Sequence, residues 1–184
     1  MTAASPAVIN FDWRAPDFRL SDTKGRVWTL DQLRGSKGLL LMFICNHCPY
    51  VRAVVDKIAR EGKALRDMGF GVAAVCSNDS SAQPEDSFER MGAFAREHHF
   101  GFPYLHDLDQ KVARAYGAAC TPDFYGFNSE LKLQYRGRLD DSGPNPHPGA
   151  RRELFEAMKQ VADTGQGPRE QMPAIGCSIK WKAA

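Results

Sequence analysis

The apolar positions of the chain follow two spacings, which predict which segments are strands and which are helices. Residues 39–44 are all apolar, Leu-Leu-Leu-Met-Phe-Ile, and Cys45 follows them directly. A continuous apolar run of this length is typical of a strand that is covered on both faces. We therefore expect residues 39–44 to form the central strand of a sheet. Two further buried strands are expected, at residues 70–76 and through residues 104–105.

Four other segments carry apolar residues every three or four positions, as on the buried face of an amphipathic helix. We expect helices from residue 49 to near Gly69, from Pro84 to about His98, from Asp109 to Gly117, and from about Arg151 to Asp163. Asp109 is expected to cap the third helix, because a side-chain oxygen in this position accepts backbone N–H groups of the first turn.

Turn residues between alternating segments predict two hairpins. Residues 18–30 alternate around Thr23-Lys24-Gly25, and residues 123–127 and 131–136 flank Asn128-Ser129. The chain from about residue 164 to 184 is rich in Gly and Pro and shows no periodicity, so we expect an irregular tail. The alternation of strands and helices predicts one α/β domain over residues 1–184, with a central mixed sheet flanked by helices and an N-terminal hairpin extension.

The composition is that of an ordinary globular protein and narrows the classes of partner. The 184 residues are 43% hydrophobic and 25% charged, with 24 Lys and Arg against 22 Asp and Glu. A net charge of +2 gives no field that would argue for nucleic acid or membrane partners. Residues 1–10 lack the basic flank and apolar run of a secretory signal, and no stretch reaches transmembrane length. We therefore expect a cytoplasmic protein.

Two of the five cysteines stand where thiol chemistry is favoured. Cys45-Asn46-His47-Cys48 lies between the predicted central strand and the helix that follows it. Unpaired N–H groups and the positive end of the helix dipole at such a junction stabilise a thiolate and lower a cysteine pKa from about 8.5. Two sulfurs at this spacing also lie within bridging reach. The pattern predicts a redox-active dithiol at Cys45 and Cys48.

The order of the pair along the chain suggests separate roles for its members. Cys45, nearer the strand end, is expected to be the more exposed and to attack a disulfide, and Cys48 is expected to resolve the mixed disulfide. His47 is expected to support the thiolate as an imidazolium between the two sulfurs, which would make the couple more oxidising.

Several motifs together resemble the thioredoxin-like superfamily, in its redoxin branch related to alkyl hydroperoxide reductase and thiol-specific antioxidant proteins. Ala15-Pro16-Asp17-Phe18-Arg19-Leu20 with Lys24-Gly25 resembles the opening of redoxins. Cys45-Asn46-His47-Cys48-Pro49-Tyr50-Val51 is similar to a bacterial thioredoxin-like subgroup, and Thr121-Pro122 precedes a predicted strand. The resemblance covers nearly the whole chain.

The resemblance implies a thioredoxin-like fold and a thiol–disulfide oxidoreductase that uses no organic cofactor, because the cysteines carry the electrons. It implies that Pro122 is cis and faces the Cys pair, and that the backbone of Thr121 pairs with substrate. The partners would be protein or small-molecule disulfides and thiols. Because redoxin relatives often dimerise, the resemblance also allows a homodimer.

A thiol peroxidase is the first alternative. Redoxin relatives that reduce peroxides carry the signature Pro-x-x-x-Thr-x-x-Cys. Counting back from Cys45, Met42 stands in place of Thr and Gly38 in place of Pro, and counting back from Cys48 gives Cys45 and Leu41. Disulfide exchange is therefore favoured over peroxide reduction.

A soft-metal protein is an alternative of another class. Cys45 and Cys48 could hold copper or zinc with His47, Cys120 or Cys177 as a third ligand. Structural zinc sites usually have two paired-ligand clusters, and the second is missing here, so we assign no metal site.

The remaining cysteines divide into two kinds. Cys76 stands in an apolar strand, where a cysteine is usually core filling. Cys120 lies two residues before Pro122, and Cys177 would reach it if the tail folds back, so we expect a second redox pair between Cys120 and Cys177.

Overall fold

The strand that leads to Cys45 is an interior strand of a mixed sheet in the computed structural model, which describes residues 3–4, 10–143 and 145–183. This strand is β4 (Gly38–Phe43). The other strands of the seven-stranded sheet are β2 (Arg19–Asp22), β3 (Val27–Thr29), β5 (Phe70–Cys76), β6 (Tyr104–His106), β8 (Asp123–Asn128) and β9 (Leu133–Gly137). The order is β3-β2-β6-β5-β4-β8-β9, with β4, β5 and β6 parallel and the other pairs antiparallel.

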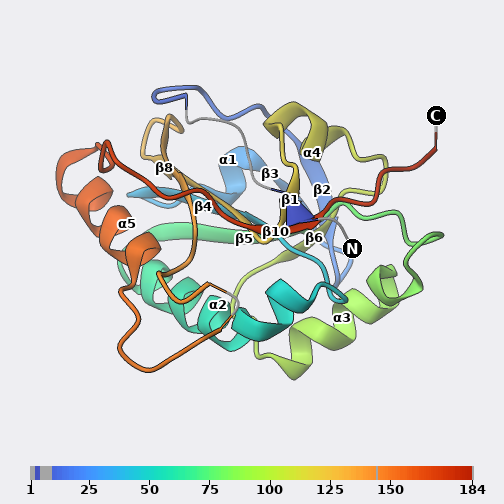
Figure 1. The fold of residues 1–184 in the computed structure, drawn as a ribbon. Coiled ribbons are helices and arrows are strands. Elements are labelled where there is room, and N and C mark those ends of the chain that lie inside the picture. The colour runs from blue at the N-terminus through green and yellow to red at the C-terminus, as the bar shows by residue number, and fades with distance from the viewer. Residues whose placement is uncertain (1–2, 5–9, 144, 184) are drawn as a thin grey trace.

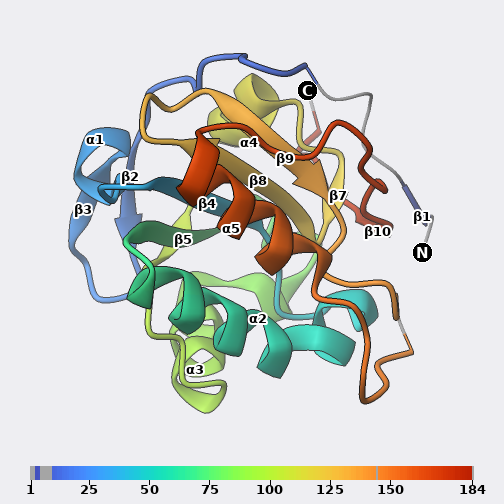
Figure 2. The ribbon, with the colours of Figure 1, turned by 90° about the vertical axis from the view of Figure 1, so that its left-hand side faces the viewer.

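Helices cover both faces of this sheet, as the apolar run predicted. Leu40 and Met42 pack with α2 (Pro49–Asp67), α3 (Phe88–Glu97) and α5 (Glu153–Thr164). Leu41 and Phe43, on the opposite face, pack with α1 (Leu30–Leu33) and α4 (Lys111–Tyr116). Figure 1 shows α2 and α3 below the sheet and α4 above it, and Figure 2 shows α5 beside α2. The predicted α/β class, with a mixed sheet between helices, is confirmed.

A second, small sheet connects the two ends of the chain. Its strands are β1 (Ala3–Ala4), β7 (Cys120–Thr121) and β10 (Gly176–Ser178), in the order β1-β10-β7. Both pairs are antiparallel, and Figure 1 shows β1 beside β10. The sequence predicted no element after residue 164, so β10 is a correction. Its three residues are too few to show a period.

Two helix starts differ from the sequence predictions. The segment from Pro84 is a short 3-10 turn, η1 (Pro84–Asp86), and α3 begins only after Ser87, whose Oγ accepts the N–H of Arg90. At α4, Asp109 accepts a single N–H, that of Lys111, whereas Asp107 accepts those of Val112 and Ala113. A carboxylate two positions earlier therefore supplies most of the capping. The predicted N-terminal hairpin is formed by β2 and β3, with β3 at the sheet edge.

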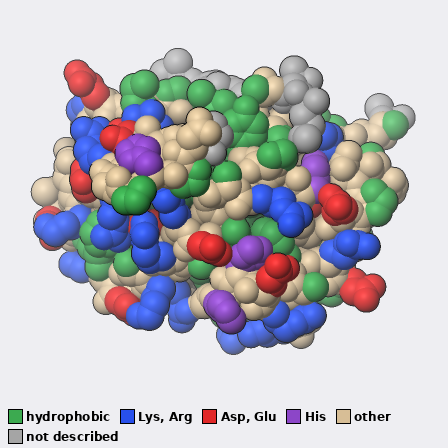
Figure 3. All heavy atoms as spheres, turned by 60° about the horizontal axis from the view of Figure 1, so that its bottom comes forward, with side chains coloured by type: hydrophobic (Ala, Val, Ile, Leu, Met, Phe, Trp, Pro, Cys, Tyr) green, Lys and Arg blue, Asp and Glu red, His purple; other side chains and the backbone are tan. Residues whose placement is uncertain are grey.

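The surface over α2 and α3 carries charges of both signs. Figure 3 shows Lys and Arg side chains on this face with Asp and Glu side chains among them, in keeping with 24 basic and 22 acidic residues in the chain. Among the helices of the described residues, none combines the length and the apolar character needed to cross a membrane.

Candidate active site

The two cysteines of the Cys-x-x-Cys motif lie at the junction of β4 and α2. Cys45 is the second residue after β4, and Cys48 is the N-cap of α2, with Pro49 at the first helical position. Proline fits there because the missing N–H would have no partner within the helix. Both cysteines are 0% exposed, so the expectation that Cys45 is the more exposed of the two is wrong. Access to either sulfur therefore requires a local opening of the site.

Cys45 is held as a thiol. Burial raises the pKa of Cys45 well above that of an ordinary thiol, and the neighbouring Cys48 and the charge of Asp86 raise it further. The Thr121 hydroxyl, 3.2 Å from the Cys45 Sγ, acts in the opposite direction by stabilising the thiolate. Thr121 is thus the residue that favours ionisation of Cys45.

Cys48 is the sulfur on which the site stabilises negative charge. The Cys45 thiol hydrogen bond lowers the pKa of Cys48 to about 5 against the opposing effect of burial, with further help from Cys177 and from backbone amides including that of Val51. The Cys48 Sγ also lies 3.2 Å from the carbonyl oxygen of Thr121, to which it donates when protonated. The pair therefore holds a single negative charge and one shared proton at neutral pH. Attack by Cys45 requires that proton to pass to Cys48.

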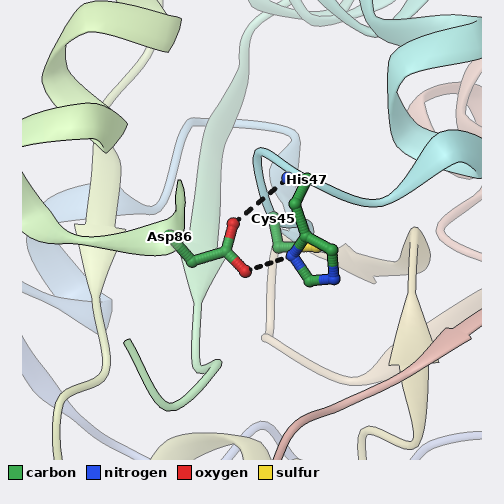
Figure 4. A group of neighbouring side chains, drawn as sticks. All are labelled: Cys45, His47 and Asp86. Atoms are coloured by element: carbon green, nitrogen blue, oxygen red, sulfur yellow. Dashed lines mark hydrogen bonds and ion pairs between the residues drawn. The ribbon is translucent and has the colours of Figure 1, made fainter. Parts of the chain in front are cut away.

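The imidazole of His47 is held by Asp86 and lies beside Cys45. The His47 Nδ1 lies 2.5 Å from the Asp86 Oδ2. Figure 4 shows the two side chains facing each other across this contact. The other carboxylate oxygen of Asp86 accepts the backbone N–H groups of Asn46, at 2.7 Å, and of His47, at 3.2 Å. The His47 Nε2 is buried and has no hydrogen-bond partner among the residues that the structure describes. One ligand atom each of Cys45, His47 and Asp86 lie within 4.8 Å of one another.

Asp86 is the site residue that the sequence analysis missed. It is 0% exposed and also accepts the side-chain N–H of Asn78 at 2.8 Å. The signal was present in the predicted topology, because parallel neighbours β4 and β5 end at the same edge of the sheet. Polar residues after β5, such as Asn78 and Asp86, are therefore expected beside the residues that follow β4.

Thr121 and Pro122 close the site from the other side. The peptide bond between them is cis, as the resemblance implied, and Thr121 contacts both cysteines through its hydroxyl and its carbonyl. The next residue, Asp123, is completely buried and pairs with Arg136 of β9 at 3.0 Å. This pair fixes the residue that follows Pro122 against the neighbouring strand β9.

The other three cysteines lie in different surroundings. The Cys177 Sγ is 2.7 Å from the Cys48 Sγ, whereas the Cys120 Sγ faces the carbonyl of Pro122 at 3.7 Å. The expectation that placed Cys177 against Cys120 is thus corrected, because the register of β10 sets Cys177 opposite Thr121 and Ser178 opposite Cys120. Cys76 is buried in β5, and burial raises its pKa to about 12.

An apolar cavity of about 160 Å³ opens beside Pro122. Tyr50 and Val54 of α2 line one side of it, and Met172 and Ile175 of the C-terminal segment line another. Met172 and Ile175 are more than half exposed. The cavity is therefore an apolar recess next to the two thiols.

The chain is similar to several known proteins. The model of the AhpC/TSA family matches residues 12–138. An uncharacterized conserved protein from Geobacillus kaustophilus is 41% identical, with a TM-score of 0.94 over 100% of this chain and 98% of that one. A hypothetical protein from Sinorhizobium meliloti 1021 is 39% identical, with a TM-score of 0.93 over 98% of this chain and 99% of that one.

A more distant likeness extends to the thioredoxin domain of a thiol-disulfide oxidoreductase from Bacteroides vulgatus. It is 16% identical, with a TM-score of 0.65 over 84% of this chain and 99% of that one, which is a likeness of fold. Among curated proteins, no match is found.

Proposed function

Because this chain belongs to the AhpC/TSA family, within the thioredoxin-like superfamily, we propose that it is a thiol–disulfide oxidoreductase whose redox couple is Cys45 and Cys48. The family and the fold support a thiol-based redox function. The observation that carries the specific activity is the shared charge of the two sulfurs, with the pKa of Cys48 lowered to about 5 at the N-terminus of α2. A thiolate at neutral pH is the species that attacks a disulfide.

The proposed reaction proceeds through a mixed disulfide. The Cys45 thiolate attacks one sulfur of a substrate disulfide, forming a Cys45–substrate bond while the substrate S–S bond breaks and its leaving thiolate takes up a proton. Cys48 then attacks the Cys45 Sγ, which forms the Cys45–Cys48 disulfide and releases the second substrate thiol. Two electrons pass from the protein to the substrate, and the reverse sequence oxidises a dithiol. We propose protein or small-molecule disulfides as partners.

Peroxide reduction is a second candidate, favoured by the family match and by one contact. Met42, in the position where the peroxidase signature has Thr, is buried in the core, so it offers no hydroxyl to a peroxide. Thr121 nevertheless places a hydroxyl 3.2 Å from the Cys45 Sγ. This contact supplies one of the two missing features, and the proline at position 38 is still absent, since Gly38 stands there.

Metal binding is a third candidate, favoured by the grouping of ligand atoms from Cys45, His47 and Asp86 within 4.8 Å. A thiolate, an imidazole and a carboxylate form a donor set that suits zinc. Asp86 is already satisfied by several donors, and within this group of three described residues only the His47 Nε2 is a buried side-chain nitrogen or oxygen without a hydrogen-bond partner. The set therefore ranks below the dithiol.

The test is the reduction potential of the purified protein against glutathione, measured for wild type, Cys45→Ser and Cys48→Ser, with metal content assayed in the same samples. Cys76→Ser is the matched control, because Cys76 is an equally buried cysteine outside the site. We expect a two-electron couple in wild type and Cys76→Ser that is lost in Cys48→Ser and changes its potential in Cys45→Ser, where the Cys45–Cys48 disulfide cannot form, with no stoichiometric metal. A protein without an exchangeable couple, or one with copper or zinc that depends on Cys45, would contradict the proposal.

A further inference from the structure

The C-terminal segment fixes a third cysteine in the site. β10 pairs with β7 on one side and with β1 on the other, so Cys177 lies opposite both Thr121 and Ala3. The residues after it are anchored too: the N–H of Ile179 donates to the carbonyl of Ala119 at 3.1 Å, and that of Lys180 to Asn78 Oδ1 at 2.9 Å. Cys177 is 1% exposed, so its side chain is buried at the site.

The Cys177 side chain meets the resolving sulfur directly. Its Sγ is 2.7 Å from the Cys48 Sγ, compared with about 2.05 Å for a disulfide bond. Cys48 thus has a neighbouring thiol on each side, Cys45 in the motif and Cys177 on β10. By contrast, the Cys120 Sγ lies 3.7 Å from the carbonyl oxygen of Pro122.

We propose that Cys177 is a third redox-active thiol that exchanges with the Cys45–Cys48 disulfide, an inference that rests on the proposed function. The Cys177 sulfur, on losing its proton, attacks the Cys48 Sγ, so that a Cys48–Cys177 bond forms as the Cys45–Cys48 bond breaks. The electron pair of the broken bond goes to Cys45, which takes up the proton that Cys177 released. The three sulfurs hold one disulfide before and after the step, and Cys45 returns to the thiol form.

The charges around Cys177 suit this sequence of events. In the reduced protein, three effects raise the pKa of Cys177 to about 12. Burial is the largest, and the hydrogen bond to Cys48 and the negative charge of Cys48 are the other two. Cys177 is then a hydrogen-bond donor that stabilises the Cys48 thiolate. When Cys48 enters a disulfide it loses that charge, and two of the three effects that keep Cys177 protonated disappear. Oxidation of the motif thus activates the third thiol.

The test is the disulfide pattern formed with oxidised glutathione, trapped with acid and alkylation and mapped by mass spectrometry. In Cys45→Ser we expect an intramolecular Cys48–Cys177 disulfide, and in Cys45→Ser/Cys177→Ser a glutathione adduct on Cys48 in its place. Cys45→Ser/Cys120→Ala is the control, and it should keep the Cys48–Cys177 disulfide. Circular dichroism of each variant establishes that it is folded.

The outcomes separate this inference from the proposed function. If wild type forms Cys45–Cys48 but Cys45→Ser carries only a glutathione adduct with an alkylated Cys177, Cys177 is a structural thiol and the inference is overturned. If wild type forms neither a Cys45–Cys48 nor a Cys48–Cys177 disulfide, the proposed function itself fails. Should Cys45→Ser not fold, Cys177→Ser alone decides: the alkylated fraction of Cys45 in the oxidised protein should fall to background, and an unchanged fraction overturns the inference.

Discussion

The carboxylate of Asp86 lies 2.5 Å from the Nδ1 of His47 and is completely buried. It also accepts two backbone N–H groups of the Cys-x-x-Cys loop and the side-chain N–H of Asn78. A single carboxylate therefore fixes the shape of the loop between Cys45 and Cys48, and its charge acts on Cys45.

Asp86→Asn is expected to destabilise the protein and to make Cys45 more acidic. The amide N–H groups of the new Asn face the N–H groups that the carboxylate of Asp86 accepts, so at least one hydrogen bond is lost. We expect the free energy of unfolding to fall by about 1–3 kcal/mol. Loss of the negative charge removes one of the effects that raise the pKa of Cys45, so that pKa falls. Chemical denaturation and the pH profile of Cys45 alkylation measure the two effects. Asp31→Asn, at a surface ion pair, is the control, and equal effects from both variants would contradict this role of Asp86.

A pH titration of the reduced protein should show one thiolate that forms at acidic pH. We expect the ultraviolet absorbance of this thiolate to appear with a midpoint at about pH 5 in wild type and to be absent in Cys48→Ser. Cys45→Ala should raise the midpoint more than Cys45→Ser, because serine keeps a hydrogen-bond donor. An unchanged midpoint in Cys45→Ala would show that the two sulfurs are not coupled.

The same thiolate predicts how stability depends on pH. The pKa of Cys48 is lowered on folding from an ordinary 9.0 to about 5, so its contribution to stability is complete above pH 9. As the pH falls from 9 to 5, the unfolded chain takes up the proton first and the contribution is lost. The stability difference between reduced wild type and Cys48→Ser should therefore shrink across this window, as measured by denaturation at several pH values. A difference that grows toward acid would have the wrong sign.

The sequence predicted the parts of this molecule that depend on long local patterns. The apolar run before Cys45 predicted the central strand, and the spacing after Cys48 predicted α2, so the junction between them could be placed. The contact between Cys48 and Cys177 could not, because it depends on the register of a three-residue strand 129 positions away. A short strand in a Gly- and Pro-rich segment gives no period, and pairing between distant segments is not encoded in either one alone.

Thr121→Val is expected to slow the reaction of Cys45. The valine keeps the shape of threonine but removes the hydroxyl 3.2 Å from the Cys45 Sγ, which is the interaction that lowers the pKa of Cys45. A hydrogen bond of about 1 kcal/mol corresponds to roughly a fivefold lower alkylation rate at neutral pH. Thr121→Ser, which retains the hydroxyl, is the control. Equal rates for the valine and serine variants would show that the contact has no effect on reactivity.

Reduced protein is expected to react faster with oxidised glutathione than with hydrogen peroxide at equal concentrations. The buried Met42 and the Gly38 in the signature positions leave the Thr121 hydroxyl as the remaining feature that would activate a peroxide. Stopped-flow mixing, with the oxidised cysteines identified by mass spectrometry, compares the two oxidants. A faster reaction with peroxide that is lost in Thr121→Val would place peroxide reduction first.

Arg136→Met is expected to loosen the segment of residues 121–123, and its effect should depend on pH. Arg136 donates to Asp123 at 3.0 Å and to the carbonyl of Gly117 at 2.8 Å, and removing one partner of a buried pair costs about 3–5 kcal/mol. Burial raises the pKa of Asp123 above its usual 3.8, against the opposing effect of Arg136. Without Arg136 that pKa rises further, so the stability deficit is smallest in acid, where Asp123 is protonated in both proteins, and grows as the pH rises from the wild-type pKa toward the higher pKa of the variant. Denaturation of wild type and variant between acid and neutral pH measures this trend.

Arg34→Met, at an exposed pair with Asp31, should change stability by no more than about 0.5 kcal/mol. Asp123→Asn/Arg136→Met should recover part of the loss, because the carboxylate without a partner is gone. If the loss of stability in Arg136→Met did not depend on pH, or if the double variant recovered none of it, packing of the Arg136 side chain rather than its charge would hold residues 121–123 in place.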